Sequence, residues 1–397
     1  MKRPCLRGLK AFVSQRLRLK AYLRAPGDGR TRPQLPARVL LWSQLACLVL
    51  REVSYHAMES LVRSPARGAL GVGQRFGDDA LAYFTERLDP VPTRQALAQV
   101  LRRAKRNKAF DRTWRIGLAL DGTGAARSTQ AGCRLCHPVL DPHHQVIGHN
   151  HRFSLITVVG TGLTLPFDVE PYGPGDSEYA ASQRLLERAV QLLGPRFADY
   201  VVADSLYATA PFLHRAGDLG LPVLARLKSN LPELWNQAQQ RWAQAAPTQR
   251  FRCGRDRVEM WEADDFDPWD SLRWKTVRVI RYRQTKPDGT VHEAYWLTDF
   301  PKTRASAQSL YHLAKSRWEV ENQGFNDGKT RYGMEHLPHH HENSLLIHWL
   351  LICLALTIER LYRLRYLHRG LHSPHTSIAL LWLFRLSLGQ PQVFDSS

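Results

Sequence analysis

The order of apolar and polar residues divides this chain into a helical beginning, an alternating middle and a helical end. Residues 37–110 carry mostly helical periodicity, with helices expected at 78–88 and 94–110. From residue 115 onward, short apolar runs of strand length alternate with helical periodicity. The expected strands are 115–121, 152–160, 163–170, 200–204 and 222–227, and the expected helices are 177–194, 209–219, 304–323 and 343–368. This order predicts an α/β fold with a mixed sheet flanked by helices.

Residues 229–300 interrupt this alternation with a different pattern. They contain two β-patterned runs, 276–283 and 291–298, and the Asp288-Gly289 pair between them is typical of a hairpin turn. We therefore expect a β-rich insertion before the helical end of the chain.

The charge of the chain favours a polyanionic partner. Its 397 residues include 55 Lys+Arg and 36 Asp+Glu, which gives a net charge of +19. A positive field of this size attracts nucleic acid first and anionic membrane second. The expected helix 94–110 is strongly basic, so it is a candidate for contacting DNA or, alternatively, a solvated basic helix. Its cations are Arg94, Arg102, Arg103, Lys105, Arg106 and Lys108.

Two features bear on where the protein works. The apolar runs 39–50 and 345–358 are shorter than the ~20 residues of a spanning helix, so buried core helices are expected and no membrane partner. Six cysteines in a chain of this length do not suggest a disulfide framework. We therefore expect a cytoplasmic protein.

Two aspartates follow apolar, strand-like runs. Asp121 follows 116–120 and is succeeded by small residues, and Asp204 follows 200–203. In open α/β sheets ligands bind beyond strand ends, so neighbouring strands would bring both carboxylates to one cation. Mg²⁺ prefers such oxygen ligands, and a metal pair ~4 Å apart can activate a nucleophile and stabilise a leaving oxygen. Each aspartate alone could equally be an ordinary turn or helix cap.

A third carboxylate lies on the expected helix around residue 321. Arg317 precedes Glu321 by four positions, which puts both on one helix face. Glu319 lies about 200° around the helix from Glu321, so the two cannot serve one site. Trp318 could stack on an unpaired base or belong to the core. The pattern indicates Asp121, Asp204 and Glu321 as a catalytic, metal-binding set.

With these residues the chain resembles the DDE transposases of bacterial insertion sequences, in particular the group with a Tyr-x2-Arg-x3-Glu-x6-Lys motif around the third carboxylate. The resemblance covers roughly 115–370 and includes the order of the elements and the position of the β-rich insertion. It implies an RNase H-like core that uses Mg²⁺, or Mn²⁺, to cleave DNA and transfer the freed 3′-OH to target DNA. It also implies binding of double-stranded DNA at transposon ends and a homodimer in the DNA complex.

The resemblance also indicates the organisation of the chain. We expect a helical, basic, DNA-binding region at 1–110, the first part of the core at 111–228 and the insertion at 229–300. The core is then completed at 301–370, and a tail follows at 371–397.

The motif is not matched at two positions. Its Tyr position is Ala314, with Tyr311 one turn earlier, and its Lys position is Gly328, with Lys329 next. On an ideal helix the eighth residue after Glu321 is rotated by about 80° relative to Glu321.

Five residues are expected to bind DNA. Their cations would contact phosphates and the indole would stack. They are Arg226, Lys228, Arg317, Trp318 and Lys329.

Cysteine and histidine residues gather between the first two expected strands. Cys133, Cys136 and His137 have the spacing of a metal knuckle, and four more histidines follow by residue 151, so a structural Zn²⁺ is one interpretation. A His-rich surface loop with two incidental cysteines is the other. Residues 339–342, His-His-His-Glu, could be a polar loop, a DNA contact or a metal-binding cluster, and the polar loop is the preferred interpretation.

Two other functions are compatible with the same residues. One is a metal-dependent DNA nuclease without strand transfer. The other is a DNA-binding relative without catalytic activity, which the two unmatched motif positions favour.

Overall fold

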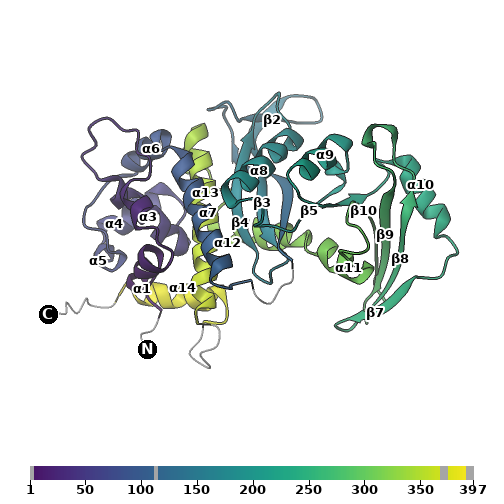
Figure 1. The fold of residues 1–397 in the computed structure, drawn as a ribbon. Helices are drawn as coiled ribbons and strands as arrows, with labels where there is room; N and C mark the ends of the chain where they lie inside the picture. The colour runs from purple at the N-terminus through teal and green to yellow at the C-terminus, as the bar shows by residue number, and fades with distance from the viewer. Residues whose placement is uncertain (1–3, 111–114, 367–373, 390–397) are drawn as a thin grey trace.

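The amino-terminal third of the chain is a cluster of helices packed around the buried helix α3 (Ala37–Val49). The structure is a computed structural model that describes residues 4–110, 115–366 and 374–389. The helices lie together at one end of the molecule (Figure 1). The others are α1 (Leu6–Ala11), η1 (Phe12–Arg16), α2 (Lys20–Arg24), α4 (Tyr55–Arg63), α5 (Arg67–Leu70), α6 (Asp78–Arg87) and α7 (Pro90–Arg106).

Helix α7 begins four residues before its expected start at 94. Asp89 caps it by accepting from the Val91 N–H, and Pro90 occupies the first helical position, where its missing N–H costs nothing. Arg94, on the inner face of this helix, is buried and donates to Asp168 on another element. Its inclusion among the candidate DNA contacts is therefore wrong.

A buried ion cluster joins this helical region to the rest of the protein. Asp168 is fully buried, and its two oxygens accept from Arg94 Nε at 2.9 Å and from Arg188 Nε at 2.6 Å. Arg94 lies on α7, whereas Asp168 lies on strand β4 (Leu165–Tyr172) and Arg188 on helix α8 (Glu178–Leu193). The cluster therefore links three elements that are distant in sequence.

The centre of the molecule is a mixed sheet of RNase H-like topology. Strand β1 (Gly117–Ser128) pairs antiparallel with β3 (Val146–Val159), which pairs antiparallel with β4. On its other side β1 is parallel to β5 (Tyr200–Ala203), which is parallel to β6 (Val223–Leu227). Helix α8 connects β4 to β5, and α9 (Ala210–Asp218) connects β5 to β6. The predicted α/β fold is thus confirmed.

The β-rich insertion continues this sheet. After helix α10 (Pro232–Arg241) its strands are β7 (Gln249–Cys253), β8 (Asp256–Phe266), β9 (Val277–Thr285) and β10 (Val291–Thr298), with a short turn η3 (Asp270–Leu272). β10 pairs with β6, so one ten-stranded sheet runs through the core and the insertion (Figure 1). The predicted hairpin joins β9 and β10, and Gly289 has the positive φ, 83°, that its turn requires.

The two faces of the central sheet carry different helices. On β1 and β3, Gly122 and Ser154 face α8, because the Ser154 hydroxyl donates to Glu178 O and a Cβ at Gly122 would meet the Glu178 carboxyl. Leu155 points the opposite way and lies against Gly324. Since side chains alternate along a strand, Asp121, which pairs with Leu155, faces the segment of Gly324 and not α8.

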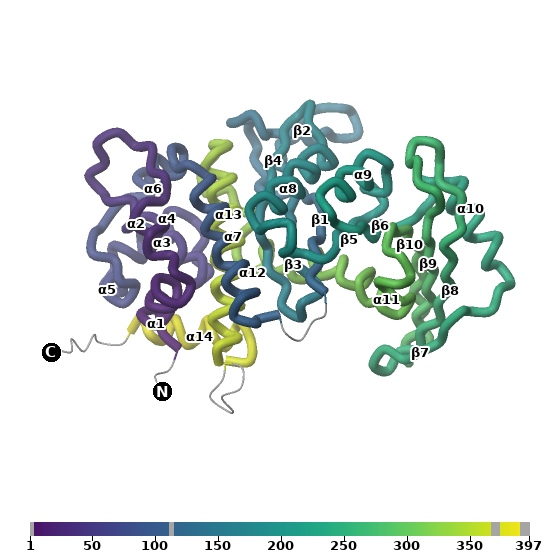
Figure 2. Tube along the Cα trace, in the orientation of Figure 1, coloured from purple at the N-terminus to yellow at the C-terminus, as the bar shows by residue number. Residues whose placement is uncertain are grey.

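The expected helix 304–323 is interrupted. It is divided between α11 (Ala307–Lys315) and a π-helical segment η4 (Val320–Phe325), and the helical stretch continues beyond it as α12 (Asn326–Tyr332). The tube trace shows α11 beside the insertion and α12 closer to the helical region (Figure 2). This stretch therefore runs along the sheet from the insertion towards the helices.

Helix α13 (Glu342–Leu364) runs between the sheet and the helical region, next to α7 (Figure 1). It is long and apolar enough to cross a membrane, but 94% of its apolar window is buried inside the protein. The prediction of a core helix agrees with this burial. A further helix, α14 (Ser377–Leu386), lies within the expected tail, of which 371–373 and 390–397 fall outside the described residues.

Candidate active site

Asp121 lies where β1 parts from its parallel neighbour. The pairing of β1 with β5 ends at Ala119 and Val202, but β1 continues to Ser128 alongside β3. The expectation that the strand ends at Asp121 is therefore wrong, since the long hairpin with β3 extends it. Burial raises the pKa of Asp121 to about 7, Arg317 opposes this rise, and the nearby carboxylates of Glu321 and Glu178 add to it.

Asp204 directly follows β5, the parallel neighbour of β1. The last paired residues of the two strands are Ala119 and Val202, so each aspartate comes two residues after the end of the pairing. The two carboxylates therefore leave the sheet from equivalent positions on neighbouring strands. Oδ1 of Asp204 accepts from the Leu206 N–H at 2.7 Å and caps the short helix η2 (Ser205–Tyr207), while Oδ2 lies 3.9 Å from Lys228 Nζ. Asp204 therefore caps η2 with Oδ1, and Oδ2 remains available to a ligand.

Glu321, on η4, is linked to Asp121 by the Arg317 side chain. The buried Arg317 guanidinium donates to Glu321 and also lies 3.6 Å from Asp121 Oδ2. Glu319 points elsewhere, because it accepts from the Thr164 hydroxyl at 2.8 Å and from the Gly160 N–H. Glu319 is therefore held by Thr164 and Gly160, whereas Glu321 shares Arg317 with Asp121.

The π-helical segment accounts for the displaced lysine. An α-helix repeats its hydrogen bonds from i to i+4, whereas a π-helix uses i to i+5 and so takes in one more residue per turn. Because η4 begins at Val320, the eighth residue after Glu321 reaches the face that the seventh would occupy in an α-helix. Lys329 accordingly donates to the Gly124 carbonyl of β1 at 3.0 Å, three residues beyond Asp121.

Glu178, the first residue of α8, is a fourth carboxylate at this site. A Cβ at Gly122 would lie 2.1 Å from the Glu178 carboxyl, so only glycine next to Asp121 lets this side chain approach the strand. Its Oε1 accepts from the Tyr207 hydroxyl at 3.0 Å, and burial raises its pKa. Sequence reasoning missed Glu178, because an acidic residue in the first turn of a helix is common.

The oxygens of the three candidate carboxylates are too far apart to bind one metal ion together in this structure. Among the described residues, Asp121, Asp204 and Glu321 do not form a group whose oxygens all lie within 4.8 Å of one another. The Arg317 guanidinium contacts both Asp121, at 3.6 Å from Oδ2, and Glu321. The Glu321 side chain is 41% exposed.

The other residues expected to contact DNA are Trp318, Arg226 and Lys228, on the glutamate-bearing stretch and on or just after β6. Trp318 is half-buried and packs edge-on against Trp296, with ring centroids 6.1 Å apart. Arg226 lies over the Trp318 ring at 5.8 Å. Lys228, two residues further along, is exposed. Tyr311, the residue nearest to the unmatched Tyr position, is buried in a core with the insertion and does not reach the site.

The cysteine knuckle lies near the far end of β1, and its partners differ from those expected. His137, a predicted ligand, instead has its Nε2 2.9 Å from the Tyr172 carbonyl. Cys133 and Cys136 lie together with His151 and His340. His340 belongs to the 339–342 segment interpreted as a polar loop, and its Nε2 lies 3.2 Å from Cys136 Sγ.

Comparison with known proteins identifies a family that matches most of the chain. Residues 118–358 match the family model described as transposase DDE domain. Among solved structures, the chain is similar to the piggyBac transposase in a synaptic complex with hairpin DNA determined by cryo-EM. The identity is 10% and the TM-score 0.45, over 99% of this chain and 83% of that chain. No curated relative matches the chain significantly. The matched span contains Asp121, Asp204 and Glu321.

Proposed function

From the premise that this chain belongs to the transposase DDE-domain family, we propose that it binds transposon ends, cleaves DNA there and transfers the freed strand to target DNA. Asp121, Asp204 and Glu321 are the proposed catalytic carboxylates. The observation that carries the proposal is the parallel register of β1 and β5, which supports Asp121 and Asp204 acting side by side. The Arg317 guanidinium, which contacts both Asp121 and Glu321, supports the third assignment.

The proposed cofactor is a divalent metal ion, Mg²⁺ or Mn²⁺. The carboxylates of Asp121, Asp204, Glu178 and Glu321 offer only oxygen ligands, which suits these ions. Burial, with a smaller contribution from Glu321 and Glu178, raises the pKa of Asp121, so the folded protein disfavours its charged form and a cation would offset this. When bound, the metal would activate the attacking hydroxyl and stabilise the leaving oxygen. Glu178 is proposed as a further ligand or as a residue that positions the others.

The cations around the carboxylates would hold the DNA backbone. Lys329, next to Gly124, and Lys228, next to Asp204, lie on either side of the proposed site. Arg226 lies further along β6, above Trp318. Phosphate contacts of this kind position the DNA without reading its sequence. Trp318 would stack on an unpaired base where its exposed edge allows it.

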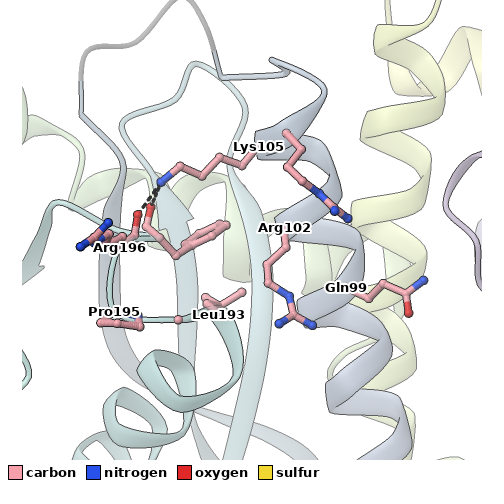
Figure 3. A pocket seen from close by; sticks show the side chains of 9 residues that line it. Gln99, Arg102, Lys105, Leu193, Pro195 and Arg196 are labelled. Atoms are coloured by element: carbon pink, nitrogen blue, oxygen red, sulfur yellow. Dashed lines mark hydrogen bonds between the residues drawn. The ribbon is translucent and has the colours of Figure 1, made fainter.

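We propose that the helical region also binds transposon ends, through the C-terminal end of α7. There a groove of about 670 Å³ lies between α7 and the loop before β5, and its rim carries Arg102, Lys105, Arg106 and Arg196 (Figure 3). Lys105 is tied to the carbonyls of residues 196 and 197, whereas Arg102 and Arg106 are exposed. The loop precedes β5 and Asp204 follows it, so this groove and the carboxylates lie at opposite ends of the strand.

A net charge of +19 fits binding of double-stranded DNA over an extended surface. A homodimer in the DNA complex, origin from an insertion sequence and a cytoplasmic location complete the proposal.

The test uses the full chain with the DNA that flanks its coding sequence on both sides. We expect cleavage that depends on Mg²⁺ or Mn²⁺, and joining of pre-cleaved 3′ ends to a second duplex. Asp121→Asn, Asp204→Asn and Glu321→Gln should each abolish both reactions, while the exposed Asp265→Asn should retain them. Cleavage without joining would instead identify a nuclease, and DNA binding without cleavage would identify an inactive relative. Full activity of the three variants would refute the site.

A further inference from the structure

Two cysteines and two histidines meet near the end of β1, away from the carboxylates. Cys133 Sγ lies 3.9 Å from Cys136 Sγ, and His151 Nε2 lies 3.3 Å from Cys133 Sγ and 3.4 Å from Cys136 Sγ. His340 Nε2 lies 3.2 Å from Cys136 Sγ. The four ligand atoms all lie within 4.8 Å of one another.

These separations match the edges of a tetrahedron around one zinc ion. With Zn–S bonds of about 2.3 Å and Zn–N bonds of about 2.0 Å, ideal tetrahedral angles put the two sulfurs ~3.8 Å apart and sulfur and nitrogen ~3.5 Å apart. The observed distances differ from these by a few tenths of an ångström. The sulfur separation is nearly twice the ~2.05 Å of a disulfide bond, so the cysteines are not paired with each other.

The surroundings of the cluster orient its ligands. His151 is fully buried, and its Nδ1 lies 2.5 Å from the Ala126 carbonyl, so that nitrogen carries the proton and Nε2 turns its lone pair to the sulfurs. The Gly132 N–H points at Cys136 Sγ at 3.5 Å. A Cβ at Gly132 would lie 2.5 Å from the His340 ring, so glycine is needed for this histidine to enter.

We propose that Cys133, Cys136, His151 and His340 bind a structural Zn²⁺. Four protein ligands fill a tetrahedral ion and leave no open position for substrate, which distinguishes this site from a catalytic one. Binding would release the thiol protons as the two sulfurs become thiolates. The site is separate from the carboxylates proposed to act on DNA, so it stands or falls independently of that function.

The ion would fasten together two segments that are distant in sequence. Cys133 and Cys136 precede β2 (His137–Leu140) and His151 lies on β3, whereas His340 comes just before α13. The ion pair of Arg134 with Glu342, at 2.7 Å, joins the same two segments but is exposed, so it contributes little alone. The zinc would therefore fix the extended β1–β3 hairpin against the core helix.

The test measures the metal content of the full chain expressed with zinc in the medium and then desalted. We expect one zinc ion per chain by plasma mass spectrometry, and, after exchange, a Co²⁺ form with thiolate-to-metal absorption. Cys133→Ser, Cys136→Ser and His340→Asn should each lose the zinc. Cys253→Ser, His143→Asn and His137→Asn should keep it, the last because His137 contacts Tyr172 instead.

Circular dichroism of each variant separates loss of the site from loss of the fold. A folded Cys136→Ser or His340→Asn protein that still holds one zinc ion would overturn the proposal. A wild-type chain that neither contains zinc nor takes up Co²⁺ would overturn it as well. Should the cysteine variants fail to fold, the wild-type stoichiometry and the Co²⁺ spectrum still decide, since two thiolates produce absorption that a nitrogen-and-oxygen site lacks.

Discussion

Acid should destabilise this protein through His348, a buried histidine on α13. Its side chain is only 3% exposed, and Nε2 lies 3.3 Å from the Gly333 carbonyl, to which it donates in the neutral form. Burial lowers the pKa of His348 from 6.5 to about 4, and neighbouring His336 adds to this effect. The folded protein therefore keeps the ring neutral in a pH range where an unfolded chain would protonate it.

The sign and size of the effect follow from proton linkage. Between pH 6.5 and pH 4 the unfolded state binds more protons than the folded state, so stability is lost as pH falls through that window. From pH 7 to pH 5 the loss attributable to this one group is about 2 kcal/mol. The substitution His348→Gln removes the titration while its amide can still donate to Gly333.

The assay is urea unfolding of the full chain at pH 7 and pH 5, followed by circular dichroism. We expect the free energy of unfolding of the wild type to fall by about 2 kcal/mol more than that of His348→Gln. The exposed His143→Gln serves as a control and should behave like the wild type. Equal pH dependence of wild type and His348→Gln would refute the reasoning.

Four further predictions concern the buried Arg94–Asp168 ion pair and the candidate active site. Arg94→Met should lower the free energy of unfolding by about 3 kcal/mol in urea, because it removes one partner of the fully buried Asp168; a loss under 1 kcal/mol would contradict this account. Glu178→Gln should slow DNA cleavage about 10- to 100-fold in single-turnover assays while DNA affinity is unchanged. Gly122→Ala should reproduce that defect, since its methyl group would displace the Glu178 carboxyl, and wild-type cleavage by either variant would remove Glu178 from the site. Lys329→Ala should weaken DNA binding and reduce the slope of log affinity against log salt by about 1, so an unchanged slope would exclude a phosphate contact.

Much of the fold follows from local patterns. The run 200–203 is apolar at every position because β5 is buried on both faces, and such runs mark central strands in any context. The hairpin of β9 and β10 follows from its Asp-Gly turn. The candidate carboxylates Asp121 and Asp204 could be found because each follows a run of this kind.

Other features depend on contacts between distant segments. The π-helical segment carries no clear sequence signal. It lies against β3 through Gly324, whose missing side chain admits Leu155 and Thr157, and it returns Lys329 to the side of Gly124. The identity of the second histidine at the cysteine cluster has the same origin, because His340 is separated from Cys136 by 204 residues.

The sequence by itself therefore determined the presence of the five core strands β1, β3, β4, β5 and β6, the basic charge and which carboxylates to consider. Each of these depends on a side chain's own chemistry or on its immediate neighbours. Only the tertiary structure decided which side chains meet. In the folded chain Arg94 contacts Asp168, Glu178 lies beside Gly122, and His340 lies with the two cysteines in place of His137. The reason is that a buried charge or a metal ligand is completed by whichever partner the fold brings within a few ångströms, and sequence spacing does not encode that distance.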